Sequence, residues 1–144
     1  MIIDGQMIFE MDWVETATAE AVSADTIDCG VANPNLGVGT PLWVNVVVAV
    51  QFTSGGADTN VFTLYDTQDD AASPGDPDAA AWAILLQSEA YLKAACFPGA
   101  HLLVVPLPAC HRRHLKIGWT IAAQILTAGM INAYISSHSA PRRL

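Results

Sequence analysis

The sequence predicts an all-β protein built from two antiparallel sheets packed face to face. One observation is the segment 41–52 (PLWVNVVVAVQF), in which every second residue from Leu42 to Phe52 is apolar, as in a strand with one buried face. Residues 112–123 (RRHLKIGWTIAA) alternate in the same way. Gly, Pro, Asn and Asp separate such segments at intervals of about 8–12 residues or more, and no segment has a clear amphipathic helical period. We therefore expect about eight strands.

Length and composition suit a single domain. The 144 residues are enough for one domain with its own core, so we predict one domain over residues 1–144. Hydrophobic residues make up 52% of the chain, and we expect part of this surplus to lie in a subunit interface. The cysteines are odd in number and widely spaced, which predicts free thiols in a reducing cytoplasm for Cys29, Cys96 and Cys110.

No segment predicts a membrane span or a secretory signal. The longest apolar window, 42–50, is about half of the ~20 residues that a spanning helix needs, and Asn45 interrupts it. The first residues include acids and no Lys or Arg, so they lack the positively charged region of a secretory signal. We therefore expect no membrane partner.

Charge is divided along the chain. All fourteen acids lie between Asp4 and Glu89, and all six Lys and Arg residues lie from Lys93 onward, so the two parts carry −14 and +6, which gives the net charge of −8. One explanation is pairing within the chain between neighbouring strands. The other is an acidic face toward water and a basic edge that meets a partner. Nucleic acid is not an expected partner, because affinity for phosphates needs clustered positive charge.

The first part of the chain predicts short elements before a long central strand. Residues 1–14 mix apolar and acidic residues without a clean period, and we interpret them as an N-terminal arm or edge strand, buried in its own domain or on a neighbour. Segments 16–22 and 26–30 are candidate strands with a turn between them. The central strand is 41–52, and its Pro41 can open a strand but would interrupt the middle of one.

The middle of the chain predicts two strands around a loop. Residues 60–67 alternate as the next strand, antiparallel to the central one. Residues 68–81 carry four aspartates and no apolar period, which indicates a long surface loop, the acidic loop. Residues 82–88 have strand character, although 79–95 contains enough Ala and Leu that a helix is an alternative.

The last third of the chain predicts three strands. Residues 101–107 form the first, and their proline places its end at an edge or a bulge. A turn at 127–129 leads into the last strand, 130–137, and 138–144 is expected to be a flexible tail. Between them lies 112–123, of which one side is expected to face the core. One side carries Arg113, Leu115, Ile117, Trp119 and Ile121, and the other carries Arg112, His114, Lys116, Gly118, Thr120 and Ala122.

Few residues have the spacing of a catalytic or metal site. His111 and His114 beside Cys110 form the one ligand-like cluster, but on a strand an i, i+3 spacing points two side chains to opposite faces. His101 and His138 stand alone. The aspartates of the acidic loop do not follow the ligand order of a calcium loop. The sequence has no nucleophile-elbow serine, glycine-rich phosphate loop or HExxH motif, so we expect no enzyme activity, metal or cofactor.

Two sandwich folds fit about eight short antiparallel strands. An immunoglobulin-like sandwich is one, but its spacing of Cys, Trp and Cys is missing from this sequence. We therefore favour a jelly roll.

Five short segments follow one another along the chain: MIIDGQMIF, TIDCG, GVGTPLWVNVVV, RRHLKIGWT and LTAGMINAYI. In order and spacing they resemble the capsid cement, or decoration, proteins of short-tailed bacteriophages. The resemblance implies a jelly-roll fold and a structural virion protein, made in the bacterial cytoplasm, that sits on the outer capsid surface and clamps adjacent major capsid protein subunits. The acidic loop and the break at Pro106-Leu107-Pro108 depart from the family pattern.

Two groups of residues are candidate contacts with the capsid or another partner. For the arm the alternative is self-burial, and for the basic residues it is pairing with the protein's own aspartates. Removal of residues 1–12 is expected to leave a folded domain that no longer binds capsids. We also expect a homo-oligomer, with a dimer favoured over a trimer. The candidate contacts are Met7, Ile8, Phe9, Met11 and Trp13 in the arm, and Arg112, Arg113 and Lys116 in the basic group.

A second function fits the same fold. A carbohydrate-binding jelly-roll module of a phage tail or spike would stack a sugar on an exposed aromatic ring such as that of Trp43 or Trp82. Glycan binding without capsid affinity would favour this class. An enzyme would instead require a bound metal or a deep polar pocket.

Overall fold

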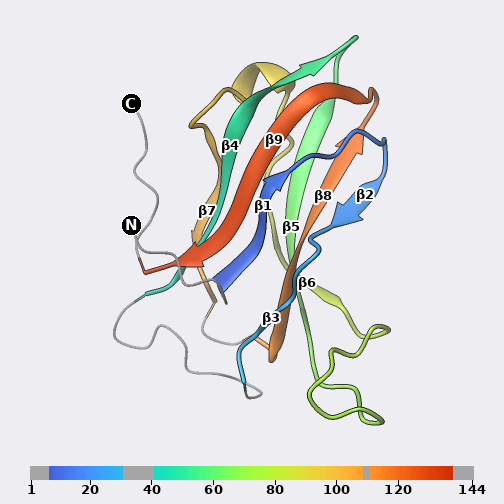
Figure 1. Ribbon diagram of the computed structural model, residues 1–144, viewed down its shortest axis with the longest axis vertical. Coiled ribbons are helices and arrows are strands. Elements are labelled where there is room, and N and C mark those ends of the chain that lie inside the picture. The colour runs from blue at the N-terminus through green and yellow to red at the C-terminus, as the bar shows by residue number, and fades with distance from the viewer. Residues whose placement is uncertain (1–6, 31–40, 109–110, 138–144) are drawn as a thin grey trace.

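Two β-sheets packed face to face form the protein (Figure 1). The computed structural model describes residues 7–30, 41–108 and 111–137. Within these ranges the chain forms nine strands and the short 3-10 helix η2. In chain order they are β1 (Ile8–Trp13), β2 (Glu20–Val22), β3 (Ile27–Asp28), β4 (Trp43–Ser54), β5 (Thr59–Thr67), β6 (Ala83–Gln87), η2 (Lys93–Ala95), β7 (His101–Pro106), β8 (His114–Ala122) and β9 (Leu126–Ser136).

All pairings between these strands are antiparallel. One sheet has the order β1-β9-β4-β7 and the other has the order β2-β8-β5-β6, with β3 also paired to β8. The two-sheet antiparallel sandwich is therefore confirmed. With β2 and β3 counted as one interrupted strand, the orders are 1-8-3-6 and 2-7-4-5. This interleaving is compatible with a jelly roll, and the jelly roll itself stays a prediction.

The long alternating segment forms β4, which lies between β7 and β9 as a central strand should. Val44, Val46 and Val48 point into the core and are buried. The alternation then breaks at Val50, which is 42% exposed, because the register with β9 shifts between Val48 and Val50. The inward face resumes at Phe52.

The relation predicted between the central strand and the next one is wrong. β5 does not pair with β4 but lies in the other sheet, where it is antiparallel to β6 and β8. Both β4 and β5 have an apolar inward face, and these faces meet across the core. The turn between them therefore carries the chain from one sheet to the other, as Figure 1 shows.

The segment 79–95, for which a helix was the alternative, contains a strand. β6 covers Ala83–Gln87 and pairs with β5, so the strand prediction is confirmed. The only helical turn described in this segment is η2, three residues long.

The turn predicted at 127–129 is wrong, because these residues lie inside β9. Gly129 has φ +154°, and the pairing of β9 with β4 shifts register on both sides of it. A β-bulge and a turn both require a residue that tolerates positive φ, so the glycine gave the same sequence signal for either. A Cβ at Gly129 would lie 2.7 Å from Cδ1 of Phe52.

Trp119 on β8 is the centre of the core. Its side chain has no exposed surface, and the ring stacks on Phe52 at 5.2 Å between centroids. The ring centroid of Phe62, on β5, lies 5.6 Å from that of Trp119. The Trp13 ring, on β1, packs edge-on against Trp119 at the same centroid distance. Four strands from both sheets thus meet at one indole ring.

A chain of buried polar groups begins at the same tryptophan. Nε1 of Trp119 donates to Oδ1 of Asn60 at 3.1 Å, and Nδ2 of Asn60 donates to Oδ2 of Asp58 at 2.6 Å. The Ser54 hydroxyl donates to the other oxygen of Asp58 at 2.7 Å. Nζ of Lys93 then donates to the carbonyls of Ser54 and Gly56 at 2.9 and 2.7 Å. The network fixes the β4–β5 turn and η2 relative to the core.

Truncating the central ring tests this packing. We expect Trp119→Ala to lower the free energy of unfolding by about 3–5 kcal/mol, because it removes contacts with three rings and leaves Asn60 without its donor. Urea denaturation measures the change. Ile84→Ala, at a residue that is 61% exposed, is the control and should change stability by less than about 0.5–1 kcal/mol. A loss below about 1 kcal/mol for Trp119→Ala would contradict the central role of the ring.

The bulge makes a second prediction. Gly129→Ala should destabilise the protein by about 1–3 kcal/mol, since the new methyl group meets a Phe52 ring that is already stacked on Trp119 and the backbone has positive φ. Gly55→Ala is the matched control, because a Cβ there has no neighbour within 4 Å. Thermal melting of the two variants compares them directly, and equal melting temperatures would contradict the predicted difference.

Candidate functional site

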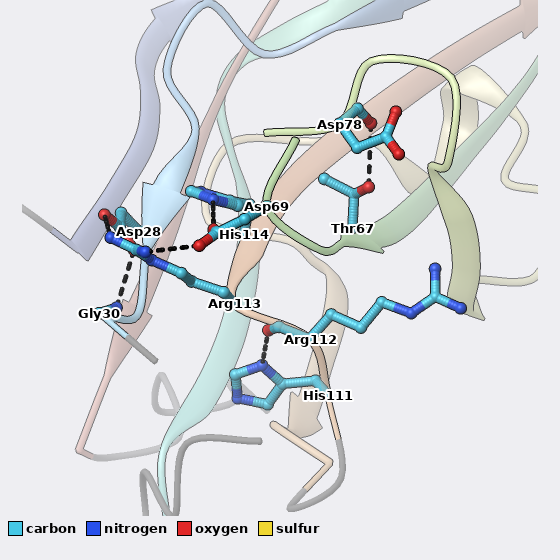
Figure 2. Close-up of polar contacts among 9 residues, drawn as sticks. All are labelled: Asp28, Gly30, Thr67, Asp69, Asp78, His111, Arg112, Arg113 and His114. Carbon is cyan, nitrogen blue, oxygen red and sulfur yellow. Dashed lines mark hydrogen bonds and ion pairs between the residues drawn. The ribbon is translucent and has the colours of Figure 1, made fainter. Parts of the chain in front are cut away.

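One end of the sandwich carries a cluster of paired charges, the clasp, made of Asp28, Asp69, Arg113 and His114 (Figure 2). Nε and Nη2 of Arg113 donate to the two carboxylate oxygens of Asp28 at 2.6 and 2.8 Å. Nη1 of Arg113 donates to Oδ2 of Asp69 at 2.8 Å, and Nε2 of the buried His114 lies 2.8 Å from Oδ1 of Asp69. The clasp ties β3 and the acidic loop to the start of β8.

The clasp shifts the pKa values of Asp28, Asp69 and Arg113. The hydrogen bonds from Arg113 lower the pKa of Asp28 from 3.8 to about 2. Hydrogen bonds from His114 and Arg113 lower the pKa of Asp69, and the same pairing raises the pKa of Arg113. The Asp28 side chain is 44% exposed, so water screens this ion pair and its contribution to stability is small.

Arg112 points away from the clasp, as Figure 2 shows. Its backbone N–H donates to Oδ2 of Asp66 at 2.8 Å, while its exposed guanidinium donates through Nη1 to the carbonyl of Ala81 at 3.0 Å. Arg112 therefore uses its side chain to hold the far end of the acidic loop. Arg112 is the most solvent-exposed of the three residues in the basic group.

The acidic loop is held by its own hydrogen bonds. Asp70 and Asp78 each accept the backbone N–H two residues ahead, at 2.8 and 3.0 Å. The Thr67 hydroxyl donates to the carbonyl of Asp78 at 2.9 Å. Asp69 and Pro77 form an isolated antiparallel β-bridge. These aspartates support turns in the loop, as short acidic side chains commonly do.

Lys116 lies on the outer face of the five-stranded sheet between two aromatic rings. Its Nζ is 4.1 Å from the centre of the Trp82 ring and 5.6 Å from that of Tyr65. The Tyr65 hydroxyl donates to the Glu20 carboxylate, and burial together with this bond raises the pKa of Tyr65 to about 12. Burial lowers the pKa of Lys116. The four residues come from β2, β5, β8 and the residue before β6, and Lys116 lies between the two rings.

The described part of the arm is an edge strand, β1, paired with β9. Phe9 and Trp13 are buried in the core of the same chain, so their side chains are not available to a partner. Met7 and Ile8 are half-buried, and Met11 is 43% exposed. Removing residues 1–12 would take Phe9 out of the core, so we expect the truncated domain to be less stable than the whole chain.

The histidines beside Cys110 do not converge. Nδ1 of His111 bonds to the carbonyl of Arg112 at 2.7 Å, whereas His114 bonds to Asp69 in the clasp. Among the described residues, no three His, Cys, Asp or Glu side chains are placed to hold a metal ion. Cys110 and His138 lie outside the described residues.

Two cysteines in the described ranges, Cys29 and Cys96, are free thiols. Burial raises the pKa of Cys29 to about 11 and that of Cys96 to about 12. Both thiols are therefore protonated at neutral pH and are poor nucleophiles.

The other end of the sandwich exposes apolar side chains, and we name Val50, Leu92 and Phe97 the apolar end. Leu92 is 54% exposed and Phe97 is 51% exposed, on either side of η2. Backbone hydrogen bonds from Phe52 to Cys96 and from Gly99 to Val48 hold Phe97 beside Val50. In Figure 1, η2 lies at the opposite end of the molecule from β3 and the acidic loop.

Fold and surface together define a two-sheet antiparallel β-sandwich protein with a charge-paired end and an apolar end. A family model described as Bbp16 matches residues 14–135, and the chain belongs to the Bbp16 family. No curated protein matches it significantly. In the part of the chain that the structure describes, no helix has the length and hydropathy needed to cross a membrane.

Sequence reasoning missed the clasp and the contacts of Lys116. The division of charge along the chain was the one available signal, since most of the acids lie far from the bases in the sequence and can pair with them only across long sequence distances. Asp28 and Arg113 are 85 residues apart, and β3 pairing with β8 brings them together. Of the two explanations for the divided charge, pairing within the chain therefore accounts for Arg113.

Neutralising one clasp acid gives a pH-dependent prediction. The folded pKa of Asp28 lies below its ordinary value, so its stabilisation is present above about pH 4 and is lost as the pH falls through about 2. Asp28→Asn should therefore lower the free energy of unfolding by less than about 1 kcal/mol at pH 7, with the difference from wild type vanishing near pH 2. Urea denaturation at pH 7, 4 and 2 measures it. Asp25→Asn, at an exposed acid, is the charge-matched control, and a difference independent of pH would argue against the pairing.

Proposed function

We propose that this protein is a structural virion protein, a capsid cement or decoration protein that binds the outside of a phage head and stabilises contacts between major capsid protein subunits. The five sequence segments that resemble cement proteins of short-tailed bacteriophages support this proposal. So does the antiparallel sandwich fold, which the resemblance implied. The role is adhesive and non-enzymatic.

The observation that carries the proposal is the apolar end. Leu92 and Phe97, on either side of η2, are each more than half exposed, and backbone hydrogen bonds hold Phe97 beside Val50. The nearby cation Lys93 is held on two backbone carbonyls. Grouped exposed apolar residues commonly mark a protein–protein contact. An apolar end on a folded, charge-paired domain suits a protein that binds to the surface of a much larger assembly.

The proposed mechanism needs only buried contact area. A cement protein that spans the seam between two shell subunits adds contacts that must break before the seam opens. A typical stable interface buries about 1,600 Å² in total, and many copies on a symmetric shell act together. Met11 and Arg112 remain proposed secondary contacts, because both are exposed in this fold.

We also propose that the protein acts as a homo-oligomer, with a dimer ahead of a trimer. Shell symmetry axes favour symmetric binders. The large exposed apolar side chains outside the apolar end, such as Val14 and Val22, provide surface for such contacts.

The carbohydrate-binding alternative has less support. Trp82 was a candidate sugar platform, and Lys116 of the same chain lies over its ring at 4.1 Å. Trp43 is half-buried within β4. A flat, open aromatic surface for stacking on sugar is therefore not offered by Trp82.

Capsid binding tests the proposal. Purified protein should co-sediment with phage heads that lack it and raise the temperature at which those heads rupture. Leu92→Asp and Phe97→Asp should each weaken binding by at least ~10-fold, because they place a charge in an apolar interface. Ile84→Asp, which changes an exposed residue on the outer side of the other sheet, should bind like wild type.

Two results would count against the proposal. Absence of wild-type binding to heads would contradict the cement function, and glycan binding in its place would favour the carbohydrate module. Equal binding of Phe97→Asp and wild type would move the contact away from the apolar end.

A further inference from the structure

The strand β7 forms an open edge of the four-stranded sheet. It pairs with β4 on one side, and within the described residues no strand pairs with its other side. The N–H of Leu107 donates to the carbonyl of Leu42 at 2.7 Å, which fixes the alternation of the ladder. Leu103 and Val105 thus direct their peptide groups to β4, and the N–H and C=O of Val104 point to the open side.

This edge carries no charged side chain to block strand addition, although it ends at Pro106 and pairs with β4 through one register shift, between Val46 and Val47. Its sequence, HLLVVP, contains no Lys, Asp or Glu, whereas natural edges are commonly protected by charges, bulges or irregular pairing. The opposite edge of the same sheet, β1, has such protection. It carries Glu10 and Asp12, pairs with two register shifts, and has Asp12 at φ +54°.

A groove of about 540 Å³ runs along the open side of β7. Leu103 and Val105 line it on the β7 side, and Gln87 and Tyr91 line it on the side of the other sheet. It reaches Phe97 of the apolar end. The groove therefore continues the surface that carries the proposed function.

One charged group in the groove indicates what it accepts. Glu89 is the only charged residue among the described residues that line it, so the groove favours a basic group. His101 also lines the groove, and its Nδ1 is buried without a hydrogen-bond partner in the described ranges.

We propose that β7 binds an extended segment of a major capsid subunit by strand addition. This inference rests on the proposed cement function and names its contact. The added segment pairs with the peptide group of Val104, places alternate apolar side chains in the groove and sets a Lys or Arg against Glu89. Main-chain hydrogen bonds then provide affinity, and the groove and Glu89 provide selectivity.

The test removes one donor at the open edge. Val104→Pro deletes the N–H that faces the groove, and Pro106 two residues later shows that this side of the strand accepts proline. Val104→Thr keeps the N–H and is the matched control. In co-sedimentation with heads lacking the protein, Val104→Pro should bind at least ~10-fold more weakly than wild type, and Val104→Thr within ~3-fold of it.

Charge and hydrogen exchange give two independent readouts. Glu89→Lys should weaken head binding more than Glu89→Gln, because it repels the proposed basic group. In the wild-type protein, the backbone amides within 101–106, where Pro106 has none, should exchange more slowly on heads than in solution. This measurement does not depend on how well Val104→Pro folds. Thermal melting checks the fold of each variant.

The possible outcomes separate the two proposals. Wild-type binding with full retention by a folded Val104→Pro, or with unchanged exchange at 101–106, overturns strand addition and leaves the cement function standing. Failure of the wild-type protein to bind heads overturns the cement function and the proposed occupant of the groove together. Selective loss in Val104→Pro and slowed exchange support strand addition.

Discussion

The packing of two apolar sheet faces around Trp119 is the interaction on which the rest of the structure depends. The indole ring touches Trp13, Phe52 and Phe62, so it links both sheets. Its N–H continues into the buried polar network through Asn60. One side chain thus sets the spacing of the layers and, through hydrogen bonds, the position of the apolar end.

At the opposite end of the molecule, charged residues pair with one another. The acids come early in the sequence and the bases late, and the fold turns part of this division into internal pairing at the clasp. Arg113 and Lys116, which looked like a basic surface in the sequence, are engaged by two carboxylates and two aromatic rings. The remaining excess of acids gives the molecule its net charge of −8. Such a body repels its own copies at long range, so attachment has to come from short-range contacts.

Much of the fold was readable from local pattern, because alternation identifies a strand and its buried face. Leu115, Ile117 and Trp119 are buried as their period predicts. The alternation pattern does not show which strands become neighbours. The predicted pairing of β5 with β4 was therefore wrong. Gly129 was read as a turn because a bulge uses the same backbone freedom.

The candidate site was less predictable than the fold. The arm had no clean period because β1 shifts register twice against β9. Phe9 and Trp13 looked like free apolar residues for the same reason, although both are core residues. The clasp depends on pairing between β3 and β8, which no local sequence signal reports.

The strand order also determines when the chain can fold. β8 and β9, the last two of the described strands, each lie between partners from much earlier in the chain, and among these strands β5–β6 is the only pair of sequence neighbours that share a ladder. Neither sheet can close while the ribosome still holds the C-terminal third. Folding is therefore expected to begin only after β9 has been synthesised and to be slow, as it is for proteins dominated by long-range pairing. Until then the strong negative charge of its first two thirds helps to keep the nascent chain in solution.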